Sequence, residues 1–175
     1  MKNKTLVRLC IGAVIAALYA AVSLALAPLS FGPIQIRIAE AMTLLPILFP
    51  EAIMGVTLGC FLTNLIGAVM GVNILGFFDV IAGTLATLIA AVLSWKLRNV
   101  RFHGLPLASA LMPVLLNAVI IGGELAYVLF PEALMTGFMI NAFQVGFGEL
   151  LACFILGLPL VRMLDKAQIA KRFGL

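Results

Sequence analysis

The chain has 175 residues, of which 64% are hydrophobic and only 10% are charged. Soluble domains carry about 25% charged residues, so this composition excludes a soluble globular protein and predicts a chain embedded in a lipid bilayer. The formal net charge of +4 follows from the way membrane proteins distribute basic residues, and we expect no nucleic-acid partner.

Apolar segments of helical length predict an all-α fold, an integral membrane bundle of six transmembrane helices in a single domain over residues 1–175. The first helix is expected over residues 6–27, because a crossing takes about 20 apolar residues. A signal peptide would start in the same way, but its apolar core usually has about 7–15 residues, and Pro28 would follow the cleavage site. The remaining helices are expected over residues 38–49, 52–72, 74–97, 105–130 and 136–164.

An extended external lid is predicted between the first two helices, over residues 28–37. Isoleucines alternate there with Gln35 and Arg37, which is the period of an extended segment. Glu40 follows in the first turn of the short second helix. We expect Gln35, Arg37 and Glu40 to close the lid over a binding site inside the bundle.

The second helix, residues 38–49, has only 12 residues and rises about 18 Å, so the distribution of charge must decide whether it crosses a core of about 30 Å. Six crossings with a cytoplasmic N-terminus place ten of the eleven basic residues inside and only Arg37 outside, whereas five crossings place eight outside. Positive residues favour the cytoplasmic side. We therefore predict six crossings, cytoplasmic N- and C-termini, and a multi-pass protein of the cell membrane in contact with lipid. The short helix must then be buried among its neighbours, or the bilayer thinned around it.

Two stripes of small residues recur at intervals of four. The first helix carries Ala13, Ala17 and Ala21, and the third helix repeats glycine or threonine over residues 55–71. Small residues at this spacing let helix backbones approach closely in a membrane. Either stripe can pack the bundle internally or dock another membrane protein. For the first helix we favour docking through the three alanines.

Polar and ionisable side chains gather in the outer halves of the predicted helices, and the inner halves carry almost none. Ionisable groups inside a membrane are costly and usually functional, so this level of the bundle predicts a substrate-binding site. Each Asn or Gln alone fits hydrogen bonding between helices equally well. The predicted substrate-binding residues are Asn64, Asp79, Asn117, Glu124, Tyr127, Asn141, Gln144 and Glu149.

Glu124 is the preferred residue for the main ligand contact. Gly122 and Gly123 open the backbone beside it, and Tyr127 lies about one helical turn away. Glu149 is the second choice. Aromatic side chains at the same level are expected to stack on the faces of a flat ligand.

The sequence indicates no enzyme. It contains no P-loop, no HExxH zinc motif and no GxSxG nucleophile. The three cysteines and the single histidine are scattered, so we expect no metal site and no cofactor. Two other classes stay open: an intramembrane enzyme that uses paired carboxylates, and a structural subunit of a membrane complex that binds no small molecule.

Three stretches resemble the QueT group of queuosine-precursor transporters: QIRIAEAMTLLP at residues 35–46, TNLIG at 63–67 and NAFQVGFGE at 141–149. Six short helices, an alanine stripe and an external lid are similar to the substrate-binding S components of energy-coupling-factor (ECF) transporters. The resemblance covers nearly the whole chain. It implies a queuosine precursor, a 7-deazaguanine base, as ligand, and docking through the alanine helix. It also implies a transmembrane coupling subunit (T component) and two cytoplasmic ATPases as partners. An S component for another vitamin is the nearest alternative.

Overall fold

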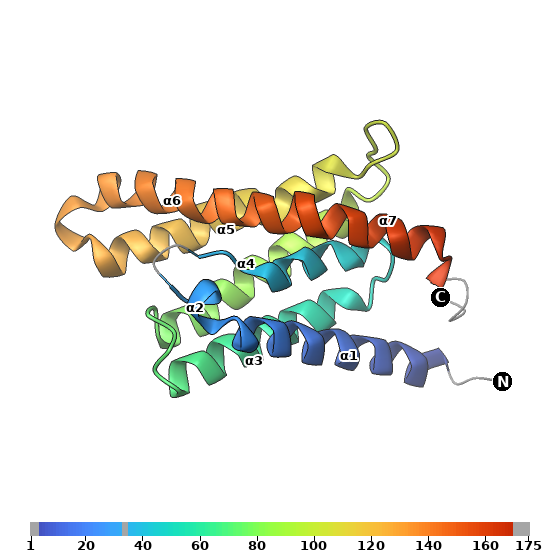
Figure 1. Cartoon of the computed structure of the whole chain (residues 1–175), viewed down its shortest axis with the longest axis horizontal. Helices are drawn as coiled ribbons and strands as arrows, with labels where there is room; N and C mark the ends of the chain where they lie inside the picture. Colours follow the sequence, from blue (N-terminus) through green and yellow to red (C-terminus); the bar gives the residue numbers. More distant parts are fainter. Residues whose placement is uncertain (1–3, 33–34, 170–175) are drawn as a thin grey trace.

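The computed structural model describes residues 4–32 and 35–169, and within these ranges the chain is all-helical, without strands. Residues 33 and 34 of the predicted lid lie outside the described part. Figure 1 shows the helices running along one long axis. The elements are α1 (Lys4–Ala25), α2 (Ala27–Ser30), η1 (Ile38–Ile47), α3 (Ala52–Val69), α4 (Phe77–Lys96), α5 (Leu107–Leu129), η2 (Pro131–Ala133), α6 (Leu134–Leu150), η3 (Leu151–Gly157) and α7 (Leu158–Lys166).

Both ends of the chain and the α4–α5 connection lie at one end of the bundle, which we call the terminal end (Figure 1). The opposite end, which we call the lid end, carries α2, the α3–α4 turn and the α5–α6 connection. Among the described residues, five helices are long and apolar enough to cross a membrane, and Ile38–Ile47 is a shorter apolar helix. The long helices therefore confirm a multi-pass membrane architecture.

The short helix η1 is enclosed by the rest of the bundle. It is a 3₁₀ helix about 20 Å long at 2.0 Å per residue, and it contacts α1, α3, α4, α5, η3 and α7. Eight of its ten residues are buried. The sequence-based expectation that this helix is buried among its neighbours is confirmed.

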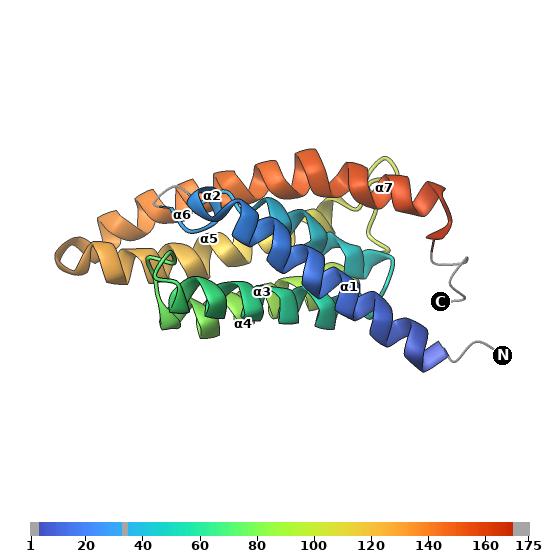
Figure 2. The same ribbon diagram turned by 60° about the horizontal axis from the view of Figure 1, so that its bottom comes forward.

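The last helix is continuous from α6 to α7 but widens in the middle. The segment η3 is a π-helix, and Pro159 follows it near the start of α7. Proline has no backbone N–H and cannot donate to the carbonyl four residues earlier, which accounts for a wider turn at this point. Figure 2 shows the orange-to-red helix passing through this segment without a break.

The lid segment is only partly extended. Residues 27–30 form the short helix α2, with Pro28 in its first turn, where a missing N–H costs no helical hydrogen bond. Gln35 to Arg37 have no helical structure. The amide of Ile36 donates to the carbonyl oxygen of Leu29 at 2.9 Å, which folds the segment back on α2.

The two stripes of small residues have different surroundings. Glycines of α3 pack against α1: a Cβ on Gly55 would lie 2.9 Å from the carbonyl oxygen of Gly12, and one on Gly59 would lie 2.7 Å from Tyr19 Cβ. Ala13, Ala17 and Ala21 are exposed. The most apolar stretch of α1 is only 17% buried, against 39–44% for the other four long helices.

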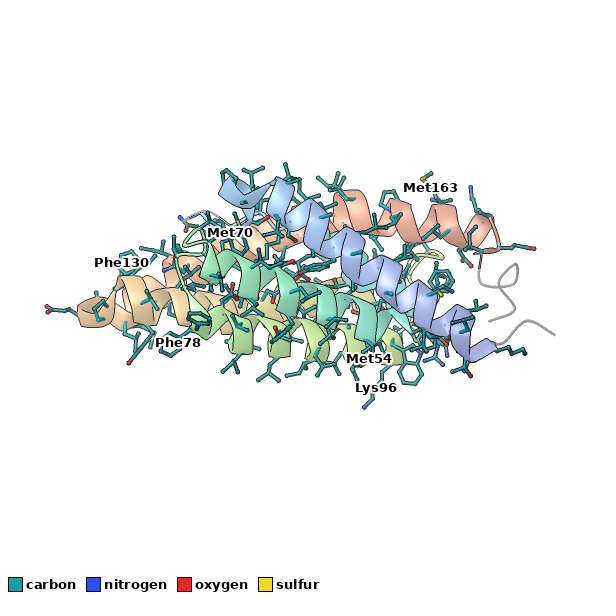
Figure 3. The ribbon with its side chains drawn as sticks, turned by 90° about the horizontal axis from the view of Figure 1, so that it is seen from below. Met54, Met70, Phe78, Lys96, Phe130 and Met163 are labelled. Atoms are coloured by element: carbon teal, nitrogen blue, oxygen red, sulfur yellow. The ribbon has the colours of Figure 1, made fainter. Side chains whose placement is uncertain are left out.

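The outer surface of the bundle is apolar along its length. Met54, Phe78 and Met163 point away from it in Figure 3, with exposed fractions of 67%, 66% and 69%. Exposed apolar surface of this extent is unusual for a soluble monomer and is what contact with lipid requires. Ionisable side chains that are buried lie in the interior and form the candidate site.

Candidate functional site

Asp79, in the first turn of α4, is fully buried and lies at the centre of a polar cluster near the lid end. Arg37 Nη2 donates to Asp79 Oδ2, and Asn73 Nδ2 donates to the same oxygen at 2.9 Å. Asn64 Nδ2, on α3, donates to the backbone carbonyl of Asp79 at 2.8 Å. A buried ion pair is costly unless further hydrogen bonds satisfy its groups. Asn73 supplies one to Asp79 Oδ2, whereas Asp79 Oδ1 has no partner among the described residues.

Arg37 connects this cluster to α2. Its Nε donates to the carbonyl oxygen of Ser30 at 3.4 Å, and its guanidinium carbon lies 6.0 Å from the centre of the Phe31 ring, about the limit of a cation–π contact. Phe31 is 1% exposed and packs on Gly67, where a Cβ would lie 2.7 Å from the tip of the ring. The guanidinium is therefore held between α2 and α4.

A second cluster surrounds Glu40 on η1, whose side chain is fully buried. Tyr19 on α1 donates its hydroxyl to Glu40 Oε1, and Thr87 on α4 donates to the same oxygen at 3.2 Å. Cys60 Sγ lies 3.3 Å from the Thr87 hydroxyl. The carboxylate of Glu40 thus joins α1, η1 and α4 in the centre of the bundle.

A third group lies where α5 meets the last helix. Glu149 is 3% exposed, as is Asn117 on α5. Cys153 Sγ lies 4.0 Å from Glu149 Oε2 and 3.8 Å from the carbonyl oxygen of Glu40. Cys60 Sγ lies 3.5 Å from Asn64 Nδ2 and 3.3 Å from the Thr87 hydroxyl, which connects the first two groups, and Cys153 connects Glu40 to Glu149. The three groups therefore belong to one polar interior.

Several buried polar atoms of this interior have no hydrogen-bond partner among the described residues. A buried polar group without a partner costs about 1–3 kcal/mol, and native proteins contain few of them. A set of them on neighbouring elements is typical of a site that binds a polar molecule. The atoms are Gln35 Nε2, Glu40 Oε2, Asn64 Oδ1, Asp79 Oδ1, Asn117 Nδ2 and both carboxylate oxygens of Glu124.

Comparison with known protein families matches the model described as QueT transporter to residues 9–166. The chain belongs to the QueT transporter family. The resemblance seen in the sequence is thereby confirmed, and this family is one of transporters rather than enzymes. No curated protein and no solved structure matches the chain.

This QueT chain places most of the residues singled out from the sequence in one interior. Asp79, Asn64, Asn117 and Glu149 are buried. Glu124 is half-buried and lies within electrostatic range of Asp79. The residues assigned to the lid are buried as well: Gln35, Arg37 and Glu40.

Three other sequence candidates have different surroundings. Asn141 is buried like the residues above, but its Nδ2 donates to the carbonyl of Gly137 in its own helix at 2.7 Å. Gln144 is half-buried. Tyr127 is 67% exposed and lies on the outer surface of α5. Among the aromatic side chains at the same level, Phe78 and Phe143 are 66% and 75% exposed, so they too face outward.

Sequence reasoning missed Tyr19, Asn73 and Thr87. Asp79, Gly83 and Thr87 are spaced by four residues on one helix, which is a signal that Thr87 shares the face of Asp79. Asn73 stands between the helices expected over residues 52–72 and 74–97, where the sequence indicates only a connection. Tyr19 stands in an apolar, alanine-rich helix, where nothing in the sequence separates a lipid-facing tyrosine from a buried one.

Proposed function

We propose that the chain is the membrane-embedded substrate-binding subunit, or S component, of an ECF-type importer that captures a queuosine precursor from outside the cell. The observation that carries this proposal is the set of unpartnered polar atoms in the interior of a QueT-family bundle. A chain that only supported a membrane complex would have no use for buried polar atoms left without partners.

The chemistry of these atoms fits the edge of a 7-deazaguanine base. The ring N–H and the exocyclic amine of such a base donate side by side, and a carboxylate accepts both as charge-assisted hydrogen bonds. Glu124 has two free oxygens for this contact, and Asp79 Oδ1 and Asn64 Oδ1 are further acceptors. Gln35 Nε2 is a donor suited to the base carbonyl. Glu149 and Asn117 supply a deeper polar wall.

We propose six crossings, with η1 as the short second one and both termini in the cytoplasm. The support is the placement of the basic residues: the α4–α5 connection lies at the terminal end with both ends of the chain (Figure 1), and this end collects Lys96, Arg98 and Arg101. Positive residues favour the cytoplasmic side. The lid end then faces the outside of the cell, from which the substrate binds.

Docking on the transmembrane coupling subunit is proposed through Ala13, Ala17 and Ala21. These residues are exposed on the helix that its own bundle covers least. The glycines of α3 are occupied by packing against α1, so the alanines form the small-residue stripe that is free for another helix. Two cytoplasmic ATPases bound to the coupling subunit would drive uptake.

The decisive experiment is to identify what the purified protein binds. We expect mass spectrometry of small molecules extracted from the detergent-solubilised protein to reveal a 7-deazaguanine, and calorimetry to show saturable binding of that base and not of unrelated vitamins. Tight binding of another vitamin would instead establish an S component of different specificity. Failure of any small molecule to co-purify or bind would mean a structural subunit.

A further inference from the structure

One oxygen of Asp79 holds two chain segments that cover the lid end. Arg37, which precedes η1, and Asn73, in the α3–α4 turn, both donate to Asp79 Oδ2. Asn73 also fixes its own turn, because its Oδ1 accepts the amide of Leu75 at 3.0 Å. Arg37 is also connected to α2, because its Nε donates to the carbonyl oxygen of Ser30. A single carboxylate oxygen therefore joins α2 to the α3–α4 turn.

The space between these two segments is not filled. A cavity of about 260 Å³ lies there, lined from one side by Ala27, Pro28, Phe31 and Gly32 and from the other by Val72 and Ile74. Phe31, which lines this cavity, is also the ring that lies 6.0 Å from the guanidinium carbon of Arg37, so the cavity adjoins the ion pair with Asp79. Separation of the two segments would break the hydrogen bonds to Asp79 and expose the polar cluster around it.

The other oxygen of Asp79 faces the interior. Asp79 Oδ1 is buried and has no partner among the described residues. It lies beside Gly83 and Asn64, since a Cβ on Gly83 would collide with this oxygen and would lie 2.7 Å from Asn64 Nδ2. Asn64 Oδ1, also unpartnered, is close by. One carboxylate thus presents one oxygen to the covering segments and the other to the candidate binding site.

We propose that Asp79 acts as a latch that holds α2 and the α3–α4 turn together over the site. Binding of a ligand favours this closed state. This inference rests on the proposed function, because it assigns the ligand to the same interior. A ligand that donates to Asp79 Oδ1 fixes the carboxylate with Oδ2 toward Arg37 and Asn73, and so favours the closed state. The α3–α4 turn acts as a second cover beside the lid segment.

The native Cys60 reports opening without any assumption about the ligand. Its side chain is fully buried, with Asn64 Nδ2 3.5 Å from its sulfur, beneath the latch. The rate at which a water-soluble maleimide modifies Cys60 in the full-length, detergent-solubilised protein, measured by mass spectrometry of the Cys60 peptide, follows the fraction of time that the interior is open.

Two substitutions separate the latch from the turn. Asn73→Asp keeps an acceptor for the Leu75 amide but replaces the donor to Asp79 by a like charge, whereas Asn73→Ala removes both contacts. We expect both variants to raise the Cys60 modification rate about tenfold or more, since a hydrogen bond to a charged group is lost, with Asn73→Asp showing the larger rise. Ser94→Ala, which removes a 2.8 Å hydrogen bond to the Ser109 carbonyl at the terminal end, controls for general loosening and should leave the rate unchanged.

The outcomes distinguish the latch from the ligand. A wild-type rate in Asn73→Asp, or an equal rise in Ser94→Ala, would overturn the latch. Addition of a 7-deazaguanine to the wild-type protein should slow Cys60 modification, and the effect should be lost in Asp79→Asn. If the Asn73 variants behave as expected but no deazaguanine binds or slows the modification of Cys60, the proposed ligand is wrong and the latch stands. If a deazaguanine binds and leaves the Cys60 rate unchanged, closure by the ligand is wrong.

Discussion

The carboxylate of Glu40 is held by hydroxyl groups from two helices, Tyr19 on α1 and Thr87 on α4. Its other oxygen has no hydrogen-bond partner in the part of the chain that the structure describes. Hydrogen bonds to a charged acceptor are worth about 1.5–3 kcal/mol each, so these hydroxyl groups fix the one ionisable side chain that η1 carries into the centre of the bundle.

Loss of the Tyr19 hydroxyl should therefore destabilise the protein. Tyr19→Phe leaves Glu40 Oε1 with Thr87 alone, and we expect the free energy of unfolding to fall by about 1–3 kcal/mol, seen as a lower thermal midpoint in detergent. Tyr127→Phe, at a 67% exposed tyrosine, is the matched control and should leave the midpoint unchanged. Equal midpoints for the two variants would mean that the Glu40 contact contributes nothing to stability.

The two carboxylates proposed for the ligand make a second prediction at this scale. Glu124→Gln and Glu149→Gln each replace an acceptor-only group by an amide, and at least one should weaken binding about ten- to a hundredfold in calorimetry, with folding intact. Glu132→Gln, an exposed carboxylate in η2, provides the matched control. Near-native affinity in both site variants would show that the ligand is bound by other residues.

Single residues also mark the limit of what the sequence predicts. Asp79 and Glu149 were found because an ionisable residue in an apolar helix is conspicuous. The pairing of Asp79 with Arg37 was not predicted, because the two residues are 42 positions apart and only tertiary packing brings them together. Tyr127 was placed by its distance of three residues from Glu124, yet its side chain is 67% exposed, whereas both carboxylate oxygens of Glu124 are buried.

At the scale of elements, long apolar runs made the helices predictable. The first helix was expected over residues 6–27 and is found at Lys4–Ala25. For the short second helix, burial was expected from its length, but its 3₁₀ geometry was not, because that geometry depends on its neighbours. The stripe spacing predicted close packing for both α1 and α3, but not which stripe faces inward.

The opposite surroundings of the two stripes predict opposite effects of added bulk. Ala17→Leu should abolish co-purification with the coupling subunit and substrate uptake, because overpacking a fitted contact costs about 1–3 kcal/mol, while ligand affinity and the thermal midpoint are kept. Gly59→Ala should lower the midpoint instead, since its Cβ would lie 2.7 Å from Tyr19 Cβ. A misfolded Ala17→Leu protein that has lost its ligand would argue against a docking role.

At the scale of the whole molecule, the bundle is polarised between a lid end and a terminal end. Basic residues in the described part of the terminal end include Lys4, Arg8 and Lys166, and Arg8 forms an ion pair with Glu51 at 3.0 Å. Arg98 stacks on Trp95, with its guanidinium carbon 4.5 Å from the ring centre, which suits an anchor at a membrane interface.

This polarity predicts the orientation of the protein in the cell. In a background without native cysteines, Glu132→Cys at the lid end should react with an impermeant maleimide applied to intact cells. Arg101→Cys, exposed at the terminal end, should react only after the membrane is opened. Labelling of position 101 but not of position 132 in intact cells would invert the topology.

The widened turn at Leu151–Gly157 constrains how the chain can change in length. Glu149 and Val161 are both buried and lie 12 positions apart, a spacing that would put them about 120° apart on a regular α-helix. The π-helix between them holds more residues per turn and so absorbs one residue, which brings the two side chains toward the same face. A one-residue deletion that turns this segment into a regular α-helix should therefore keep both side chains facing the interior, whereas the same deletion in α6 or α7, where no wide turn absorbs it, should rotate one of them away by about 100°.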